Sequence, residues 1–315
     1  MKENFHHIAL AKLCGWFGLT RQAYYQENWK EVTESTQTEV LLKEVLNIRE
    51  NHKRMGTRKL HEMLSPVMNQ HQIKMGRDKL FDLLASHHLL IRRRRRNIRT
   101  TFSNHWLRKY PNLIRGFIPT APNQLWVSDI TYWKTKHFTL YITFITDAYS
   151  HRIVGYNLAQ TLEAVECARA LQMALSALGA ESHLQPARPS GELTHHSDRG
   201  LQYCSKEYIG LLNKHNIKIS MTESGDPLEN AVAERINGIL KEEYLDAQEI
   251  KSVKEALRYL PVAIRLYNSE RPHLSISKLT PDKVHHAIEP MKVKRIWKNY
   301  YPKNKPIVNS YQDYN

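Results

Sequence analysis

The chain has 315 residues, of which 41% are hydrophobic, so it is long enough for two or three domains at roughly 150 residues each. It has no run of about 18 apolar residues, its N-terminus lacks the pattern of a secretory signal, and Cys14, Cys167 and Cys204 form no CxxC pair. These features exclude a membrane-spanning protein, a disulfide framework and a zinc ribbon, and predict a cytoplasmic protein whose net charge of +15 favours a polyanionic partner.

Residues 1–38 are predicted to form a helix-turn-helix-like segment. The stretch "HHIALAKLCGWFGLTRQAYYQ" has the pattern of a helix, a glycine-centred turn and a second helix with Thr20 as its N-cap. Residues 39–100 continue with short helices, two of which follow the Met-Gly pairs of "MGTRKL" (55–60) and "MGRDKL" (75–80). We interpret this second region as a helical DNA-binding domain, and a small helical bundle is the alternative.

A strongly basic stretch closes the helical part. Residues 91–110 hold eight basic residues and no acidic one, including Arg92, Arg93, Arg94, Arg95 and Arg96. Phosphates are their natural counterions, because each neutralised phosphate releases condensed cations. A solvated linker or a targeting tract is the alternative. Residues 101–122 are assigned to a basic linker, since glycine and two prolines in "GFIPTAPNQ" mark the start of a new domain.

After Leu125 the sequence takes on the pattern of strands. Residues 125–133, 138–146 and 152–159 are rich in β-branched and aromatic side chains and predict an antiparallel meander. Helices over 161–178, 205–216 and 224–244 alternate with short strands over 193–198 and 217–222. This order predicts an α/β core with a mixed sheet over 123–285. A basic, aromatic tail over 286–315 follows, which we expect to contact DNA, packing on the core being the alternative.

Three acidic residues of this core are candidates for chemistry. Asp129 interrupts an apolar strand, where a buried carboxylate is costly without a cation or hydrogen-bond donors. Asp198 ends a strand, and Glu234 lies on the helical arc opposite the apolar stripe. Each alone is explained as a turn-capping or solvated acid. Together they provide the oxygen ligands that Mg²⁺ prefers, and two such ions can activate a water or a 3′-hydroxyl.

The spacing and the surrounding words resemble a known family. Asp129, Asp198 and, after 35 intervening residues, Glu234 match the D,D(35)E pattern of retroviral-integrase-like polynucleotidyl transferases. Between 126 and 281, four segments resemble the catalytic core of OrfB transposases from the bacterial insertion-sequence family with two overlapping reading frames: "WVSDITYW", "HHSDRGLQYCS", "SGDPLENAVAERINGILKEE" and "YNSERPHLSISKLTP". The resemblance implies an RNase-H-like core behind an all-α, helix-turn-helix-type region.

The resemblance also implies an activity and its site. The three acids would be catalytic residues and metal ligands of a DDE transposase that uses Mg²⁺, or Mn²⁺ in its place, with two ions per site. Lys241 matches a basic residue expected to contact DNA near the scissile phosphate, and we assign Arg199 and Asn230 to DNA contacts as well. Asp147 also matches a family position, and we expect it to be structural. Glu229 departs from the family, which has Asp-Asn-Ala at this point.

The implied partners are the terminal inverted repeats of the element, target DNA, a second copy of the chain and the product of the upstream reading frame. A nuclease that transfers only to water and a catalytically silent DNA-binding regulator are the alternatives. His195 and His196 have no further zinc ligands at suitable spacing. They are therefore interpreted as packed histidines, and for His196 the alternative is that it supports the metal ligands indirectly or contacts DNA.

Overall fold

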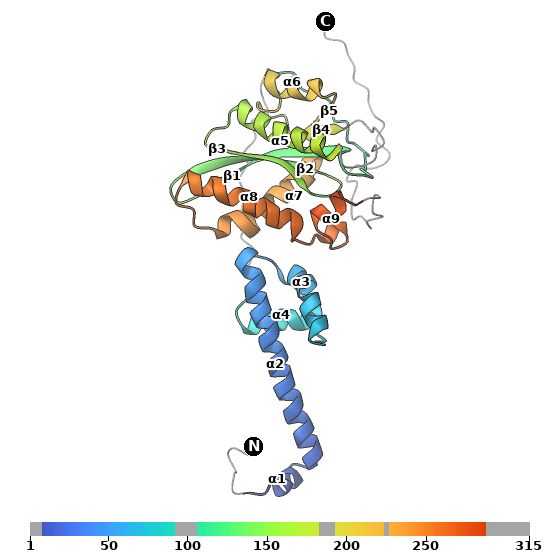
Figure 1. Cartoon of the computed structure of the whole chain (residues 1–315), viewed down its shortest axis with the longest axis vertical. Coiled ribbons are helices and arrows are strands. Elements are labelled where there is room, and N and C mark those ends of the chain that lie inside the picture. The colour runs from blue at the N-terminus through green and yellow to red at the C-terminus, as the bar shows by residue number, and fades with distance from the viewer. Residues whose placement is uncertain (1–7, 92–105, 183–192, 224–226, 288–315) are drawn as a thin grey trace. The chain divides into compact units, whose positions relative to one another are not determined.

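The computed structural model describes residues 8–91, 106–182, 193–223 and 227–287, and the chain divides into two compact units (Figure 1). One unit comprises residues 1–51 and 55–91, and the other comprises 52–54 and 92–315. The run Arg92 to Arg96 and the tail from 288 onward lie outside the described residues, so what the sequence predicts for them stays a prediction. No helix in the described ranges is long and apolar enough to cross a membrane.

The helical unit contains α1 (Leu10–Trp16), α2 (Arg21–Asn51), α3 (Thr57–Gln70) and α4 (Arg77–Ser86). Thr20 caps α2 as predicted, since its Oγ1 accepts a hydrogen bond of 3.0 Å from the N–H of Ala23. Gly56 and Gly76 stand in extended conformation directly before α3 and α4, which confirms the two Met-Gly starts. The predicted boundary between 38 and 39 falls inside α2, because residues 21–51 contain no glycine or proline to interrupt the helix.

The second unit is built on a mixed five-stranded sheet in the order β3-β2-β1-β4-β5. β1 (Leu125–Lys134), β2 (Thr139–Asp147) and β3 (Ile153–Ala159) form the predicted antiparallel meander. β4 (Thr194–Ser197) runs parallel to β1, and β5 (Lys218–Met221) runs parallel to β4. The predicted α/β class with a mixed sheet is therefore confirmed. This arrangement of strands is that of an RNase-H-like core.

Helices cover both faces of the sheet (Figure 1). α5 (Ala164–Ser182) and α6 (Lys206–Lys214) pack on one face, in a core that includes Trp126 and Ile145. α7 (Ala231–Ile239) and α8 (Val253–Ser269) pack on the other, against Leu140, Ile142 and Phe144. The alternation of Phe144 and Ile145 between the two cores follows from the two-residue period of a strand. Cys14, Cys167 and Cys204 are buried and free.

The segment predicted as one helix over 224–244 has three parts where it is described. It begins with a 3₁₀ turn at Pro227–Asn230, continues as α7, and ends in a π-turn at Leu240–Tyr244. A second 3₁₀ turn (Leu245–Ala247) leads toward α8, and a third (Leu274–Ile276) precedes α9 (Pro281–His285). The hydrophobic period predicts the helix correctly, but it does not distinguish α-helical from π-helical turns.

Strand β3 approaches α5 so closely that only glycine fits at position 155. A Cβ atom on Gly155 would collide with the carbonyl oxygen of Ala170 and lie 2.8 Å from the Cβ of Ala174. Gly155→Ala should therefore lower the free energy of unfolding by about 1–3 kcal/mol, the usual effect of overpacking a core. Urea unfolding of this variant beside Gly210→Ala tests the expectation. Gly210 is exposed within α6, and its Cβ would meet nothing within 4 Å. Equal stability of Gly155→Ala and the wild type would contradict the close packing.

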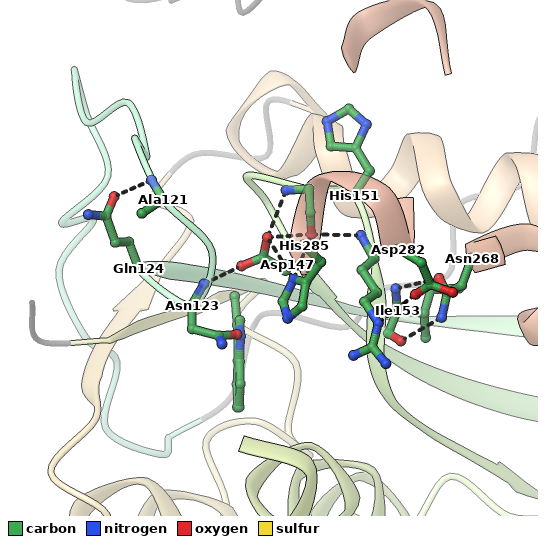
Figure 2. A network of polar contacts seen from close by, with 12 residues as sticks. Ala121, Asn123, Gln124, Asp147, His151, Ile153, Asn268, Asp282 and His285 are labelled. Atoms are coloured by element: carbon green, nitrogen blue, oxygen red, sulfur yellow. Dashed lines mark hydrogen bonds and ion pairs between the residues drawn. The ribbon is translucent and has the colours of Figure 1, made fainter. Parts of the chain in front are cut away.

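A buried polar network ties α9 to the turn between β2 and β3 (Figure 2). Asp147, with no exposed surface, accepts hydrogen bonds from the backbone N–H of Asn123 (2.7 Å) and from the N–H (2.7 Å) and hydroxyl (2.6 Å) of Ser150. The Ser150 hydroxyl also bonds His285 of α9 at 2.9 Å. Burial raises the pKa of Asp147, but His285 and the Ser150 donors outweigh it, so the pKa lies below its ordinary value. The structural role expected for Asp147 is thus borne out by its contacts.

Candidate active site

The pairing of β1 with β4 brings two of the three candidate acids to the same level of the sheet. The parallel register pairs Val127 with His196, and both strands continue in the same direction. Asp129 on β1 and Asp198 directly after β4 stand two residues beyond this pair, and both are half-buried. The N–H of Gly200 donates a 2.9 Å hydrogen bond to Oδ1 of Asp198, so the turn after β4 holds this carboxylate at the edge of the core.

The polar side of the segment around α7 faces β1. This polar arc consists of Asn230, Glu234, Asn237 and Lys241. Nδ2 of Asn230 donates to the carbonyl oxygen of Ser128 at 3.0 Å, and Nδ2 of Asn237 donates to Oδ2 of Asp129 at 2.8 Å. Glu234 stands between these two asparagines, about one turn from each, and its side chain is exposed. The polar arc predicted from the sequence therefore contacts β1, the strand that carries Asp129. Glu234, the third candidate acid, belongs to this arc.

The three acids interact electrostatically. Burial, followed by the charges of Asp198 and Glu234, raises the pKa of Asp129 to about 8, against the lowering effect of hydrogen bonds from Ile130 and Asn237. Among the described residues, no group of three or more His, Cys, Asp and Glu side chains is placed to hold a metal ion. The three acids are thus close enough for their charges to repel one another, but their side chains are not arranged as a complete set of metal ligands.

Two asparagines that hydrogen-bond β1 at Ser128 and Asp129 each keep a buried oxygen atom. Oδ1 of Asn230 and Oδ1 of Asn237 are buried and accept no hydrogen bond from any residue within the described ranges. Oxygen atoms of this kind suit the waters that Mg²⁺ keeps in its shell, and the nearby carboxylates are hard ligands of the type it prefers. The donor set therefore fits a divalent cation by its chemistry.

Three of the predicted DNA contacts fall within the described residues, and they differ in exposure. Lys241 is partly exposed in the π-turn, and its Nζ lies 3.7 Å from the ring centroid of Tyr132. Arg199 is half-buried next to Asp198. Asn230 does not fit its predicted contact, because its side chain is buried and its amide joins α7 to β1. Buried polar groups on helices are used for internal hydrogen bonds.

Asn237 and Tyr132 are the residues of the site that the sequence did not single out. Asn237 donates to the carboxylate of Asp129, and Tyr132 lies under Lys241. The helical arc that places Asn237 with Glu234 and Lys241 is the signal that could have identified it. No sequence signal singles out Tyr132, since aromatic residues at this point are ordinary for a strand.

His195 and His196 are packed side chains of β4. His195 bonds the hydroxyl of Tyr208 at 2.9 Å through Nε2. His196 bonds Oγ of Ser220 at 2.8 Å through Nδ1 and the carbonyl oxygen of Glu229 at 3.0 Å through Nε2. Burial lowers their pKa values to about 3 and about 4, so both rings are neutral at neutral pH. The expectation of packed histidines is met, and His196 joins β4 and β5 to the turn that precedes α7.

The buried neutral state of His196 predicts a pH dependence of stability. The unfolded chain takes up a proton below about pH 6.5, whereas the folded protein does not until about pH 4, so stability falls as the pH falls through this window. Between pH 7 and pH 5 the advantage of the wild type over His196→Gln in free energy of unfolding should shrink by about 2 kcal/mol.

Chemical denaturation at several pH values measures this difference. His137→Gln is the matched control, because that ring is exposed in the turn between β1 and β2. A constant difference between wild type and His196→Gln from pH 7 to pH 5 would show that the ring takes up its proton over the same pH range in the folded and the unfolded protein.

Glu229, the departure from the family pattern, makes use of its longer side chain. Its Oε2 accepts a 2.6 Å hydrogen bond from the N–H of Glu223, and its Oε1 lies 3.7 Å from Nη2 of Arg115. The same Arg115 nitrogen lies 2.6 Å from Oε2 of Glu223. Glu229 is buried, so these contacts tie the start of the α7 segment to the end of β5.

Comparisons with known proteins show similarity to integrase core domains and to proteins of insertion elements. An integrase core domain model matches residues 119–227, and a second integrase core domain model matches residues 215–281. The chain is 34% identical over 275 residues to the 31 kDa protein of insertion element IS600 from Shigella sonnei, covering 85% of this chain and 96% of that protein. It is 32% identical over 222 residues to the transposase for insertion sequence element IS629 from Shigella sonnei, covering 70% of each.

Among solved structures, similarity is found to the catalytic core domain of HTLV-2 integrase in complex with magnesium. That likeness has a TM-score of 0.38 and 20% identity, and it covers 53% of this chain and 98% of the other.

Proposed function

We propose that this chain binds the terminal inverted repeats of its own element, cleaves their 3′ ends and joins them to target DNA. The chain belongs to the integrase-core transposases of IS3-family-like insertion elements. Family membership gives the reaction class, a DDE polynucleotidyl transfer. The DNA ends, the order of steps and the individual residues are our assignments.

The observation that carries the proposal is that three acids, one from β1, one from the turn after β4 and one from α7, lie close enough for the charges of two to raise the pKa of the third. The parallel register of β1 and β4 supports a place for Asp129 beside Asp198, and hydrogen bonds from Asn230, directly before α7, and from Asn237 of α7 join the segment that carries Glu234 to β1. We assign all three as catalytic residues and as ligands of Mg²⁺, or of Mn²⁺ in its place. The bound ions would activate the attacking oxygen and stabilise the leaving oxygen of the phosphodiester.

The chain's other residues bind and orient the DNA. We assign Lys241 to a phosphate beside the acids, which its partial exposure and its contact with Tyr132 of β1 support, and we assign Arg199, next to Asp198, as a further cation for DNA. The run from Arg92 to Arg96 contributes attraction that is independent of sequence. Asn237 holds Asp129 by a hydrogen bond and so fixes the direction of its carboxylate. A second copy of the chain and the upstream reading-frame product complete the assembly on paired ends.

The test is a cleavage and joining assay in Mg²⁺ on DNA that carries the ends of the element. It uses the full chain alone and fused to the upstream product, and labelled strands report 3′-hydroxyl ends and joined molecules separately. We expect both products from at least one of the two proteins. Cleavage without joining would make the protein a nuclease that transfers to water. Binding without cleavage by both proteins would make it a regulator.

A further inference from the structure

A buried arginine outside the acidic site holds the turn that carries Lys241. Arg271, which follows α8, has 1% of its side chain exposed. Its Nε and Nη2 donate to Oε2 and Oε1 of Glu243 at 2.8 and 2.7 Å, and its Nη1 lies 2.9 Å from Nε2 of His273. Such a two-pronged arrangement fixes the orientation of both partners as well as their distance, which a lysine cannot do.

Glu243 belongs to the π-turn at Leu240–Tyr244, which continues α7 without a break. Single π-turns are rare within helices and occur frequently at functional sites. Leu240 and Tyr244 are buried, so the two ends of the turn are packed into the core. The pair with Arg271 therefore fixes the middle of a turn whose ends are already held.

Lys241 stands in this same turn, two residues before Glu243. Its ammonium group lies over the ring of Tyr132 on β1, at 3.7 Å from the ring centroid. One side chain of the turn is thus fixed by Arg271 from the α8 side, and another is directed along the strand that carries Asp129. A change in the turn's winding would move Lys241 along β1.

We propose that Arg271 is a positioning residue for the transposition reaction, acting through Glu243 and the π-turn to hold Lys241 at the DNA phosphate beside the three acids. The inference rests on the proposed function, because it concerns the same reaction. A purely structural pair is the alternative. Stability alone does not explain the pair well, since buried ion pairs can often be replaced by apolar residues without loss of stability.

The first experiment compares Arg271→Lys with the wild type in the joining assay and in binding to element-end DNA at several salt concentrations. A displaced Lys241 should lower the joining rate by about 10–100-fold, the scale of a misplacement of about 1 Å. The slope of log affinity against log salt should fall by about one phosphate contact, as it should in Lys241→Ala. Arg169→Lys is the control for replacing a paired arginine, because Arg169 pairs with Glu166 at 2.7 Å on α5, which packs on the other face of the sheet.

A second variant separates positioning from stability. In the double variant Arg271→Met with Glu243→Leu, the apolar pair keeps the core filled, so the protein should unfold at the wild-type temperature or above it. Joining should nevertheless fall as far as in Arg271→Lys. Full joining activity in a folded double variant would overturn the proposal.

The third experiment measures whether the effects of Arg271→Lys and Lys241→Ala on the joining rate are additive. If Arg271 acts through Lys241, Arg271→Lys should cause no further loss in a Lys241→Ala background. A loss of the same factor in both backgrounds would show that Arg271 acts by another route and would refute the inference. Failure of the proposed function can be distinguished from failure of this inference. In that case Glu234→Gln and the wild type would show the same joining rate.

Discussion

Replacing Asp129 with asparagine should lower the rate of DNA joining by at least about 10³-fold, the scale on which losing a key electrostatic group at a reacting centre is felt. The same change should make the metal-free protein more stable. The pKa of Asp129 is raised to about 8 in the folded protein, whereas the unfolded chain loses this proton near pH 3.9. Stability from this group is therefore present below about pH 4 and is lost as the pH rises toward 8.

Asparagine cannot ionise, so the variant should escape that loss. At pH 7, without divalent cations, its free energy of unfolding should exceed that of the wild type by on the order of 2 kcal/mol, allowing for partial exposure of the side chain. Thermal unfolding and the joining assay on one preparation test both effects. Loss of activity together with loss of stability would indicate a structural acid.

Asp147→Asn is the matched control, one strand away in the same sheet. Asp147 accepts hydrogen bonds from Asn123 and Ser150, and its pKa lies below its ordinary value, so its charged form stabilises the fold. That contribution is present above about pH 4 and is lost as the pH falls further. We expect the variant to unfold with about 3 kcal/mol less free energy at pH 7, the usual scale for breaking a buried charged hydrogen-bond network.

The Glu234→Gln variant should bind element-end DNA but form no joined product, again a fall of at least about 10³-fold. Glu234 is exposed on α7, so its replacement should change the free energy of unfolding by less than about 0.5 kcal/mol. The measurement is the joining assay beside a binding assay in Mg²⁺. The two readouts separate a lost chemical step from lost affinity.

Glu242→Gln provides the comparison for this variant. Glu242 is also an exposed acid of the same helical segment, but it lies in the π-turn and outside the arc that contains Glu234. Removing its charge changes the net charge of the protein by the same amount. Equal activities of the two variants would mean that Glu234 acts only through the general field of the protein.

Strands and helices of the core were predictable because burial imposes a period on the sequence. The β-branched runs around Asp129 and Asp147 gave the meander, and the helical period gave α7. The three acids could be predicted to share a site because the spacing of Asp129, Asp198 and Glu234 resembles a known family. Their assignment as metal ligands stays a prediction, since no group of three or more His, Cys, Asp and Glu side chains in the described ranges is arranged to hold a metal ion.

What the sequence did not predict depends on contacts between distant segments. The residues of Leu240–Tyr244 fit an ordinary helix, and the contact of Glu243 in this π-turn with Arg271, 28 residues further along the chain, has no local pattern that predicts it. Asn230 was assigned to DNA contacts together with Lys241 and Arg199. Its burial arises from the carbonyl of Ser128 on a strand 102 residues away in sequence. Long-range partners of this kind leave no local pattern.

The attachment of α9 determines how short an expressed core can be. A fragment that ends at residue 281, where the integrase core match ends, would contain every candidate catalytic acid. It would lack Asp282, the ion-pair partner of Arg152, and His285, which bonds Ser150 beneath Asp147. Such a fragment would leave a buried serine and carboxylate open to water at the turn between β2 and β3. We therefore expect soluble, protease-resistant fragments to extend past His286, and those that end at residue 281 to be cleaved at this turn.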